Sequence, residues 1–407
     1  MITLQDIEGA YRRVSDSIYR TPCNRTDHFR EAGCAALYIK LENLQRTGSF
    51  KERGALNRML HLSEEERARG VISASAGNHA QAVAYHAGRL GVPATIVMPE
   101  HTPIIKIMAT RSYGARVILS GGGFDEASQE ANRIQEREGQ VFVHAFNDPL
   151  IIAGQGTIAL ELLEQNPYLE MVVVPIGGGG LIAGVACGLK ELNPRIQIVG
   201  VESAAIPSMK TSVEANRIVE VPPAPSIADG IAVKRPGAET FPMIQKYVDD
   251  IVTVDEEEIA NAILLLLERE KTVAEGAGAV TLAALINGKI PRASGRKVGM
   301  ILSGGNIDVN VISRIIERGL AKDGRLVTLL VNVPDRPGSL AKLMTVIAEQ
   351  GANVSEVHHD RIYSTTALGE VAVEARLEMR GREHVKQLLD ALRERGYEVE
   401  VTAGVSG

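Results

Sequence analysis

The chain has 407 residues, of which 45% are hydrophobic and 23% charged, so it can bury a large core and should fold into two or three domains. A net charge of −6 argues against nucleic acid or an anionic membrane as its main partner. No apolar stretch approaches the roughly 20 residues that span a bilayer, and MITLQDIEGAYRR lacks the apolar core of a signal peptide. Three cysteines without metal-ligand spacing fit a reducing compartment. We therefore expect a cytoplasmic protein that acts on a small molecule.

From Gly70 onward, short β-branched runs alternate with helical patterns. VISAS, PATIVMP and ARVILS are each followed by a helix-like segment, and MVVVPI, IQIVGVE and KVGMILS repeat the rhythm. This alternation predicts an α/β fold with two open parallel-sheet subdomains, the smaller at about 45–145 inserted in the larger. The proline-rich, non-periodic segment 206–236 predicts a long loop over the surface or near a site.

The pattern changes after the predicted helix VNVISRIIERGLAKDG. Strand, helix, strand, strand, helix and strand follow one another over residues 325–403, with the second strand predicted at 353–362. This βαββαβ order is that of a ferredoxin-like domain. We therefore predict a boundary near 322–325, which divides a domain at 1–322 from one at 325–403.

The segment TGSFKERGALNRML places a lysine in the first turn of a predicted helix. Ser49 and Glu52 have the S-x-x-E spacing of a capping box, so Ser49 would open the helix. Lys51 would then lie at the positive end of the helix dipole, where the ammonium form is disfavoured. Partial burial would add to this effect and leave the free amine that a Schiff-base lysine requires. A solvated surface lysine is the ordinary alternative.

A run of four glycines, Gly177, Gly178, Gly179 and Gly180, follows a predicted strand and precedes a helix. Its backbone amides would form an anion cradle. Residues 178–183 also satisfy G-x-G-x-x-A, and Glu202 follows about 20 residues later, as in a dinucleotide-binding unit. A phosphate monoester, a dinucleotide and a tight turn that binds nothing all stay open on this pattern.

Two further turns follow predicted strands. Residues 75–79, SAGNH, open a helix whose amides could hold a carboxylate, although Asn78 could instead be only an N-cap. Ser303 puts a neutral hydroxyl at the carboxyl end of a strand, where open α/β sheets bind ligands. A plain loop serine is its alternative. The combination of these turns with Lys51 favours the phosphate over the dinucleotide, because NAD enzymes need no such lysine.

The motifs TGSFKERGA, SAGNHAQAVAYHA, GGGGLIAG, VAEGAGA and SGGNID closely resemble the threonine dehydratase (threonine ammonia-lyase) group of fold type II, tryptophan synthase β-like pyridoxal-phosphate enzymes. This resemblance covers about residues 1–320. PDRPGSLAKLMTVIAEQGANV resembles an ACT domain, and dehydratases with one short ACT domain match the whole chain. Serine racemases and serine dehydratases are near relatives of this group.

The resemblance implies a role for each matching residue toward pyridoxal 5′-phosphate and substrate. Lys51 would bind the cofactor covalently and later take the α-proton, and Ser75 and Glu275 are the other candidate catalytic residues. The implied cofactor contacts are Phe50 on the ring, Asn78 on the phenolic oxygen, Ser303 at the pyridine nitrogen, and Gly177, Gly178, Gly179, Gly180 and Leu181 on the phosphate. Backbone groups of Ser75, Gly77 and His79 would receive the substrate carboxylate.

These roles predict deamination of L-threonine to 2-oxobutanoate, and also of L-serine to pyruvate. A serine dehydratase or a serine racemase-like enzyme is the alternative within enzymes, and an inactive amino-acid sensor is the alternative from another class. Ala76 stands where eukaryotic-type serine racemases carry a serine, which argues against efficient racemisation. The segment SAAIPSMK lacks the acidic residue of the racemase cation site, so no required metal is expected.

The predicted ACT domain carries a candidate effector site. The turn from Asp335 through Gly338 to Ser339 would grip an amino-acid carboxylate, with Asn353 available to the amine. The resemblance implies feedback by isoleucine or valine on isoleucine biosynthesis, in a homodimer or homotetramer. The alternative is a domain that only dimerises the enzyme.

Overall fold

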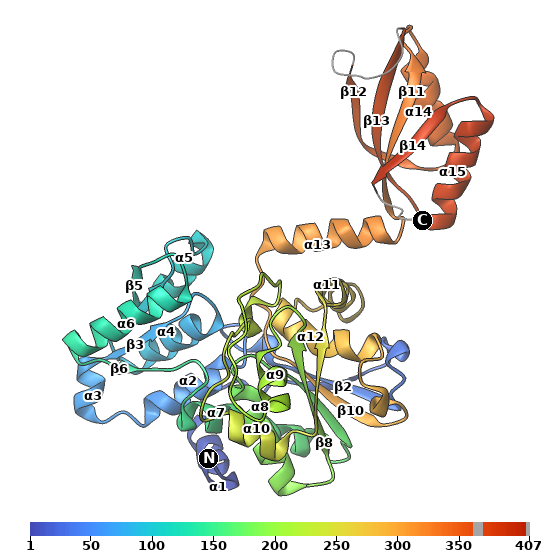
Figure 1. The fold of residues 1–407 in the computed structure, drawn as a ribbon. Helices are drawn as coiled ribbons and strands as arrows, with labels where there is room; N and C mark the ends of the chain where they lie inside the picture. The colour runs from blue at the N-terminus through green and yellow to red at the C-terminus, as the bar shows by residue number, and fades with distance from the viewer. Residues whose placement is uncertain (361–368, 404–407) are drawn as a thin grey trace. The chain divides into compact units, whose positions relative to one another are not determined.

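The computed structural model describes residues 1–360 and 369–403 (Figure 1). The chain divides into two compact units, Met1–Ile307 and Asp308–Gly407. Helix α13 (Val309–Lys322) groups with the second unit, so this division precedes the sequence-based boundary near 322–325. That boundary stays a prediction for the beginning of the ferredoxin-like domain, and the end of the strand predicted at 353–362 lies outside the described residues.

The larger sheet of the first unit has six strands in the order β1-β2-β10-β7-β8-β9. They are β1 (Cys23–Thr26), β2 (Ala36–Leu41), β7 (Met171–Pro175), β8 (Gln197–Ser203), β9 (Asp250–Val254) and β10 (Lys297–Leu302). Neighbouring strands are parallel except β1, which runs antiparallel to β2 with Cys23 opposite Lys40. The predicted parallel sheet is confirmed, and β1 adds an edge strand that precedes the α/β rhythm of the sequence.

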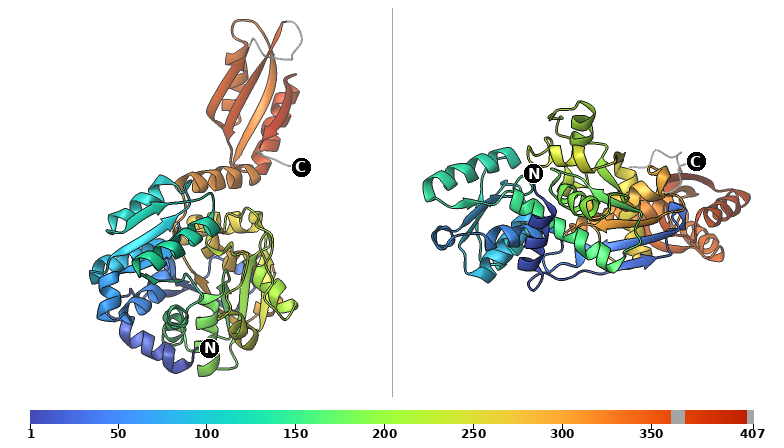
Figure 2. Two further views of the ribbon diagram at one scale, coloured as in Figure 1. Left: turned by 60° about the vertical axis from the view of Figure 1, so that its left-hand side comes forward. Right: turned by 90° about the horizontal axis from the view of Figure 1, so that it is seen from below.

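The smaller sheet has four parallel strands in the order β5-β4-β3-β6. They are β3 (Val71–Ala74), β4 (Ala94–Met98), β5 (Arg116–Leu119) and β6 (Val141–Phe142). Val71 packs in a core with residues of helix α4 (Asn78–Leu90), whereas Ile72 packs with residues of helix α6 (Phe124–Glu138). Because both faces of the sheet are covered (Figure 2), β3 and β4 are buried along their whole length.

Ten further α-helices complete the first unit. In the described part of the chain, no helix is long and apolar enough to cross a bilayer. Helices α7 and α8 approach closely, since a side-chain carbon at Gly184 would come within 2.3 Å of the Ile152 carbonyl oxygen. The ten helices are α1 (Leu4–Val14), α2 (Lys51–Leu60), α3 (Glu64–Arg69), α5 (Ile104–Ser112), α7 (Pro149–Gln165), α8 (Gly180–Leu192), α9 (Ser208–Glu214), α10 (Phe241–Tyr247), α11 (Glu256–Leu265) and α12 (Gly276–Ile286).

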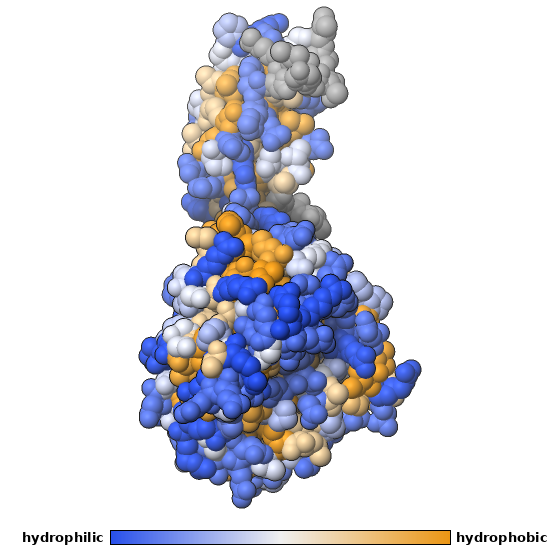
Figure 3. Space-filling view, turned by 90° about the vertical axis from the view of Figure 1, so that its left-hand side faces the viewer, coloured by the Kyte–Doolittle hydropathy of each residue, from blue (hydrophilic) through white to orange (hydrophobic). Residues whose placement is uncertain are grey.

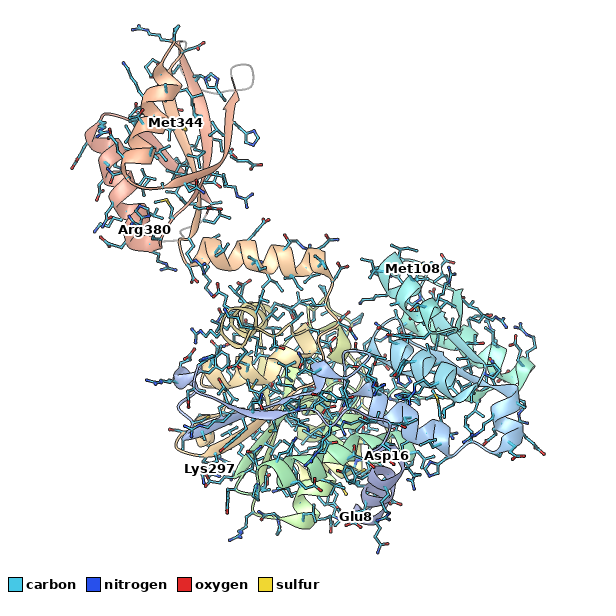
Figure 4. The ribbon with its side chains drawn as sticks, turned by 180° about the vertical axis from the view of Figure 1, so that it is seen from behind. Glu8, Asp16, Met108, Lys297, Met344 and Arg380 are labelled. Carbon is cyan, nitrogen blue, oxygen red and sulfur yellow. The ribbon has the colours of Figure 1, made fainter. Side chains whose placement is uncertain are left out.

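Helix α5 presents apolar side chains on its outer face. Ile104, Ile105 and Met108 are exposed, whereas Ile107 on the inner face is buried. Figure 3 shows apolar residues gathered on this side of the first unit, and Figure 4 shows Met108 projecting outward from the helix. Lys297, at the start of β10, also points outward in Figure 4, so the amino-terminal end of this strand faces away from the interior.

The second unit is an antiparallel four-stranded sheet in the order β12-β13-β11-β14. Alternate residues of β11 from Val327 to Val333 are buried, as expected for a sheet with helices on one face. The strands are β11 (Leu326–Pro334), β12 (Asn353–Asp360), β13 (Glu370–Glu378) and β14 (Glu398–Ala403), and the helices are α14 (Ser339–Glu349) and α15 (Arg382–Glu394). The predicted βαββαβ order is confirmed.

Four charged side chains are buried together where β2, α2 and α7 meet. Arg53 Nη2 lies 2.8 Å from Glu42 Oε1, and Arg53 Nη1 lies 2.7 Å from Glu161 Oε1. Lys40 Nζ lies 2.6 Å from Glu161 Oε2. Burial alone would raise the pKa of Glu42, but the charge and hydrogen bonds of Arg53 bring it below its ordinary value. Two cations and two carboxylates thus neutralise one another beneath α2.

Replacing Arg53 by leucine should lower the free energy of unfolding by about 3–5 kcal/mol, because the buried Glu42 would lose its ion-pair partner and Glu161 one of its two. Urea denaturation measures this change. The matched control is Arg20→Leu, which breaks an exposed pair with Glu164 and should cost at most about 1 kcal/mol. Equal losses in the two variants would show that the buried pairs contribute no more than a surface pair.

Candidate functional site

The lysine singled out in the sequence begins helix α2 at the carboxyl edge of the larger sheet. The predicted capping box is wrong: Phe50 is the N-cap, and the Glu52 carboxylate accepts from the backbone N–H of Thr47. Ser49 instead forms a β-bridge with Gly304, and the Phe50 N–H donates to the Ser303 carbonyl at 3.0 Å. Pairing between two backbone turns therefore fixes the helix start in place of a side-chain cap.

The amine of Lys51 is in an environment that favours its neutral form. Its Nζ donates to the Ala145 carbonyl at 3.0 Å and lies 5.0 Å from the centre of the Phe50 ring. Burial lowers the pKa of Lys51 to about 8, and the carboxylate of Glu275 partly opposes this shift. A half-buried amine with such a pKa disagrees with the alternative of a solvated surface lysine.

Asn78 joins the start of α4 to the start of α12. Gly77, and not Asn78, is the N-cap of α4, so the interpretation of Asn78 as only an N-cap is wrong. Its Nδ2 donates to both carboxylate oxygens of Glu275, at 2.7 and 2.9 Å. Burial raises the pKa of Glu275 to about 7, although the hydrogen bonds from Asn78 act against the shift. Glu275 can therefore change its protonation state near neutral pH.

The turn at 75–79 leaves open space above the first amides of α4. Ser75 Oγ accepts from the Gly77 N–H at 3.3 Å, and a side-chain carbon at Gly77 would meet no atom within 4 Å. Burial lowers the pKa of His79 to about 3, so its ring is neutral and its Nε2 donates to the Val143 carbonyl at 2.9 Å. The His79 side chain is thus a structural group, and the open space of this turn lies beside Gly77.

The glycine run forms a turn that larger residues could not adopt. Gly179 has φ of 95° and precedes α8, which begins at Gly180. A side-chain carbon at Gly178 would lie 2.4 Å from the Phe146 ring, and one at Gly180 would lie 2.9 Å from Phe146 Cβ. Leu181 follows as a buried residue in the first turn. The backbone N–H groups of these residues lie at the start of α8, and such a helix start is a favourable binding site for a phosphate group.

The separate turns meet at one place in the first unit. Phe146, which packs under the glycine run, directly follows Ala145, whose carbonyl binds the Lys51 amine. Ser303 is buried at the carboxyl end of β10, and Gly304 packs against Glu275. The residues therefore lie where β3, β7 and β10 end (Figure 1). This set fits a phosphate-bearing aldehyde that can condense with Lys51.

Glu202 has a structural partner that accounts for its place after β8. Its two carboxylate oxygens accept from the backbone N–H groups of Met209 and Lys210, at 2.9 and 2.8 Å, at the start of α9. The side chain is buried, and burial raises its pKa to about 7. Both carboxylate oxygens of Glu202 are therefore engaged in hydrogen bonds to the backbone. The dinucleotide interpretation needed this side chain to be available to a ligand, so it loses its support. No group of three or more His, Cys, Asp and Glu in the described ranges is placed to hold a metal.

The segment 206–236 contains α9 and a short 3₁₀-helix, Asp229–Ile231, and it borders the site. A side-chain carbon at Gly177 would lie 3.0 Å from Ile231 Cα, and one at Gly230 would lie 3.6 Å from Glu275 Oε1. Asp229 also pairs with Lys106 of α5 at 3.2 Å. The expectation of a loop near a site is therefore met, although the pattern did not reveal α9, which has only seven residues.

The candidate effector residues do not meet within one chain. Gly338, with φ of 90°, is the N-cap of α14 just beyond the end of β11. Asn353 begins β12 and donates to Glu378 Oε2 at 2.9 Å, and Glu378 pairs with Leu326 at the beginning of β11. The nine residues of β11 therefore separate the turn at 335–339 from Asn353 by about 27 Å. A site that uses both must draw one of them from a second copy.

Comparison with protein families agrees with this geometry. Residues 14–304 match the family model described as pyridoxal-phosphate dependent enzyme, and residues 323–395 match the model of the ACT domain. The chain belongs to the pyridoxal-phosphate-dependent enzyme family and carries a C-terminal ACT domain. Its cofactor is pyridoxal phosphate, which the lysine, glycine run and neutral serine fit.

Particular relatives narrow the comparison. The chain is 52% identical over 401 residues to the L-threonine ammonia-lyase of Thermotoga maritima, which covers 98% of this chain and 100% of the relative. It is 39% identical to a threonine deaminase structure from Solanum lycopersicum, with a TM-score of 0.74 over 77% of this chain and 91% of the other. It is 36% identical to a maize serine racemase structure, with a TM-score of 0.74 over 78% and 98%.

The lowered pKa of Lys51 predicts how covalent attachment of the cofactor depends on pH. Only the neutral amine condenses with pyridoxal phosphate, so the attachment rate should rise with pH up to about 8 and then level off. Visible absorption after mixing ligand-free protein with the cofactor measures this rate. A lysine with the ordinary pKa of 10.5 would instead keep gaining about tenfold per pH unit beyond pH 8, and that outcome would contradict the assigned environment.

Proposed function

We propose that this chain deaminates L-threonine to 2-oxobutanoate and ammonia, and L-serine to pyruvate more slowly. The observation that carries the proposal is the half-buried, partly neutral amine of Lys51, which lies near the glycine cradle and the Asn78–Glu275 pair. The relative from Thermotoga maritima, which matches nearly the whole chain, supports threonine as the substrate. Discrimination against serine rests on one methyl group, which is worth about 1–3 kcal/mol.

The site residues first bind and orient the reacting groups. Backbone amides of Gly177 to Gly180 and Leu181 hold the cofactor phosphate, and Phe50 packs against the ring. Asn78 would donate to the phenolic oxygen, and Ser303 would face the pyridine nitrogen. Backbone groups of the turn that contains Ser75, Gly77 and His79 would receive the substrate carboxylate beside Gly77, where there is open space. This arrangement fixes the α-carbon of threonine beside Lys51.

Lys51 then moves the proton on which the reaction depends. Bound pyridoxal phosphate supplies an electron-withdrawing ring that makes the α-hydrogen of the attached amino acid acidic. The neutral amine of Lys51 would take this hydrogen as general base, and the β-hydroxyl would leave as water with a proton from a nearby acidic group. Ser303 is neutral and cannot protonate the pyridine nitrogen as an acid would, which favours prompt loss of the hydroxyl. Hydrolysis of the released enamine gives 2-oxobutanoate and ammonia.

Two alternatives lack support from these residues. A racemase needs a second acid or base on the face opposite Lys51, and Ala76 offers none where racemases carry a serine. The likeness to the maize serine racemase therefore reflects the shared fold. An inactive sensor would not need the low pKa of Lys51 or the cradle at Gly178.

We further propose that the second unit regulates catalysis in response to isoleucine or valine, as feedback on isoleucine synthesis in the cytoplasm. The turn at 335–339 would hold the carboxylate, and Asn353 would reach the amine from a second copy. The distance between these residues within one chain supports a homodimer or homotetramer as the working form. To bind the effector, Asn353 would have to give up its hydrogen bond to Glu378 and form one with the effector amine instead.

The decisive test is formation of 2-oxo acid by the cofactor-loaded protein, with L-threonine and L-serine supplied separately. Threonine should react faster, and Lys51→Ala should lower the rate by about 10²- to 10⁴-fold or more, because it removes the general base. Lys190→Ala is the control, since Lys190 pairs with Asp249 away from the site. Absence of oxo acid from both substrates would overturn the proposal.

The regulatory proposal predicts that isoleucine or valine changes both the threonine rate and the melting temperature of the full chain. Asn353→Ala should abolish both responses, because the effector amine would lose its partner. Asn310→Ala, in α13, is the matched control and should respond as the wild type does. If neither amino acid changes the activity or the melting temperature, the regulatory proposal is wrong, and dimerisation remains as the role of the domain.

A further inference from the structure

Asn306 connects three turns of the site and has no role in the mechanism described above. It closes the SGGN turn after β10. Its Nδ2 donates to the Thr47 carbonyl at 2.6 Å and to Asn78 Oδ1 at 2.7 Å. Asn78 in turn donates to Glu275. The amide of Asn306 therefore contacts the turn before Lys51 and the first residue of α4 at the same time.

The chemistry at the two ends of this chain of hydrogen bonds fixes the direction of every bond in it. The Thr47 carbonyl can only accept, so the amide of Asn306 must present its NH₂ group there. The second hydrogen of that NH₂ group then requires an acceptor, which is Asn78 Oδ1. Asn78 is thereby obliged to turn its own NH₂ group toward Glu275, whose ionised carboxylate can also only accept.

We propose that Asn306 is a positioning residue that fixes the amide orientation of Asn78, so that Asn78 always presents a donor to the cofactor. The inference rests on the proposed role of Asn78 at the phenolic oxygen. Without Asn306, only Glu275 would set the amide orientation of Asn78, and a carboxyl group accepts at both oxygens only while it is ionised. The reversed orientation would point an oxygen at the phenolic oxygen and at Glu275, where a donor is needed.

Gly48 leaves the space that the Asn306 amide occupies. Gly48 has φ of 75°, and a side-chain carbon there would lie 2.6 Å from Asn306 Oδ1. The backbone around it is also paired, because the Gly305 N–H donates to the Gly48 carbonyl at 2.9 Å. The amide is thus enclosed between the two turns, which restricts it to the orientation that serves Asn78.

The test replaces Asn306 by aspartate, which keeps the shape but offers only acceptors when ionised. Asn78 should then turn its NH₂ group toward residue 306 and its oxygen toward the cofactor. We expect the dissociation constant for pyridoxal phosphate to rise about tenfold, the size of one lost hydrogen bond to a charged group. The pH at which the visible absorption of the bound cofactor changes should shift as well. Asn306→Ala should show the same effects in weaker form.

A double-mutant cycle separates positioning from a loss of stability. In an Asn78→Ala background, Asn306→Asp should cause no additional change in cofactor affinity or in the pH of the absorption change, because the group that it positions is gone. Asn57→Ala is the matched control: Asn57 is also a buried amide with two hydrogen bonds, to Arg13 and the Leu150 carbonyl. It should lower the melting temperature without altering either cofactor readout.

The outcomes also distinguish this inference from the proposed function. Additive effects of Asn306→Asp and Asn78→Ala, or unchanged cofactor affinity in Asn306→Asp, would overturn the positioning role even if threonine is deaminated. Conversely, a wild-type protein that binds the cofactor but releases no oxo acid would overturn the proposed function. The cofactor readouts would still decide the role of Asn306 in that case.

Discussion

The buried pairing of Arg53 with Glu42 and Glu161 is the interaction on which the position of Lys51 depends. Arg53 lies two residues after Lys51 in α2, and its partners come from the 3₁₀-turn after β2 and from α7. A buried cation with two carboxylates has few alternative geometries, so the helix cannot rotate or slide without leaving charge unpaired. Together with the bridge between Ser49 and Gly304, these pairs hold the first turn of α2 in place without a side-chain cap at Ser49.

Burial also sets the proton chemistry of the site, and it acts in opposite directions on its members. It lowers the pKa values of Lys51 and His79 and raises that of Glu275, because in each case the charged form loses its hydration. The result is an amine and a carboxyl group that both exchange protons near neutral pH, beside an imidazole that stays neutral. Burial thus makes Lys51 a usable base, lets Glu275 change its protonation state near neutral pH, and keeps His79 neutral.

The sequence predicted the fold and the motif-borne part of the site because both are local. Alternating strand and helix patterns identify parallel sheets, and the glycine run, Lys51 and Asn78 stand in recognisable turns. The contacts that join these turns are not local: Phe146 under Gly178, Ile231 beside Gly177, and Asn306 on Asn78 join residues that are 32, 54 and 228 positions apart in the chain. The capping box failed for the same reason, since a tertiary bridge between Ser49 and Gly304 replaced a local hydrogen bond.

The packing of Phe146 against the glycine run has a consequence for engineering. In the sequence the GGGGL motif is a continuous local element, but in the structure an aromatic ring from a different segment packs against its backbone. A grafted run of glycines without that ring would have a cavity below it and would sample many conformations, since glycine restricts its backbone least. Transplanting this cradle into another scaffold would therefore require moving residues 145–146 with it.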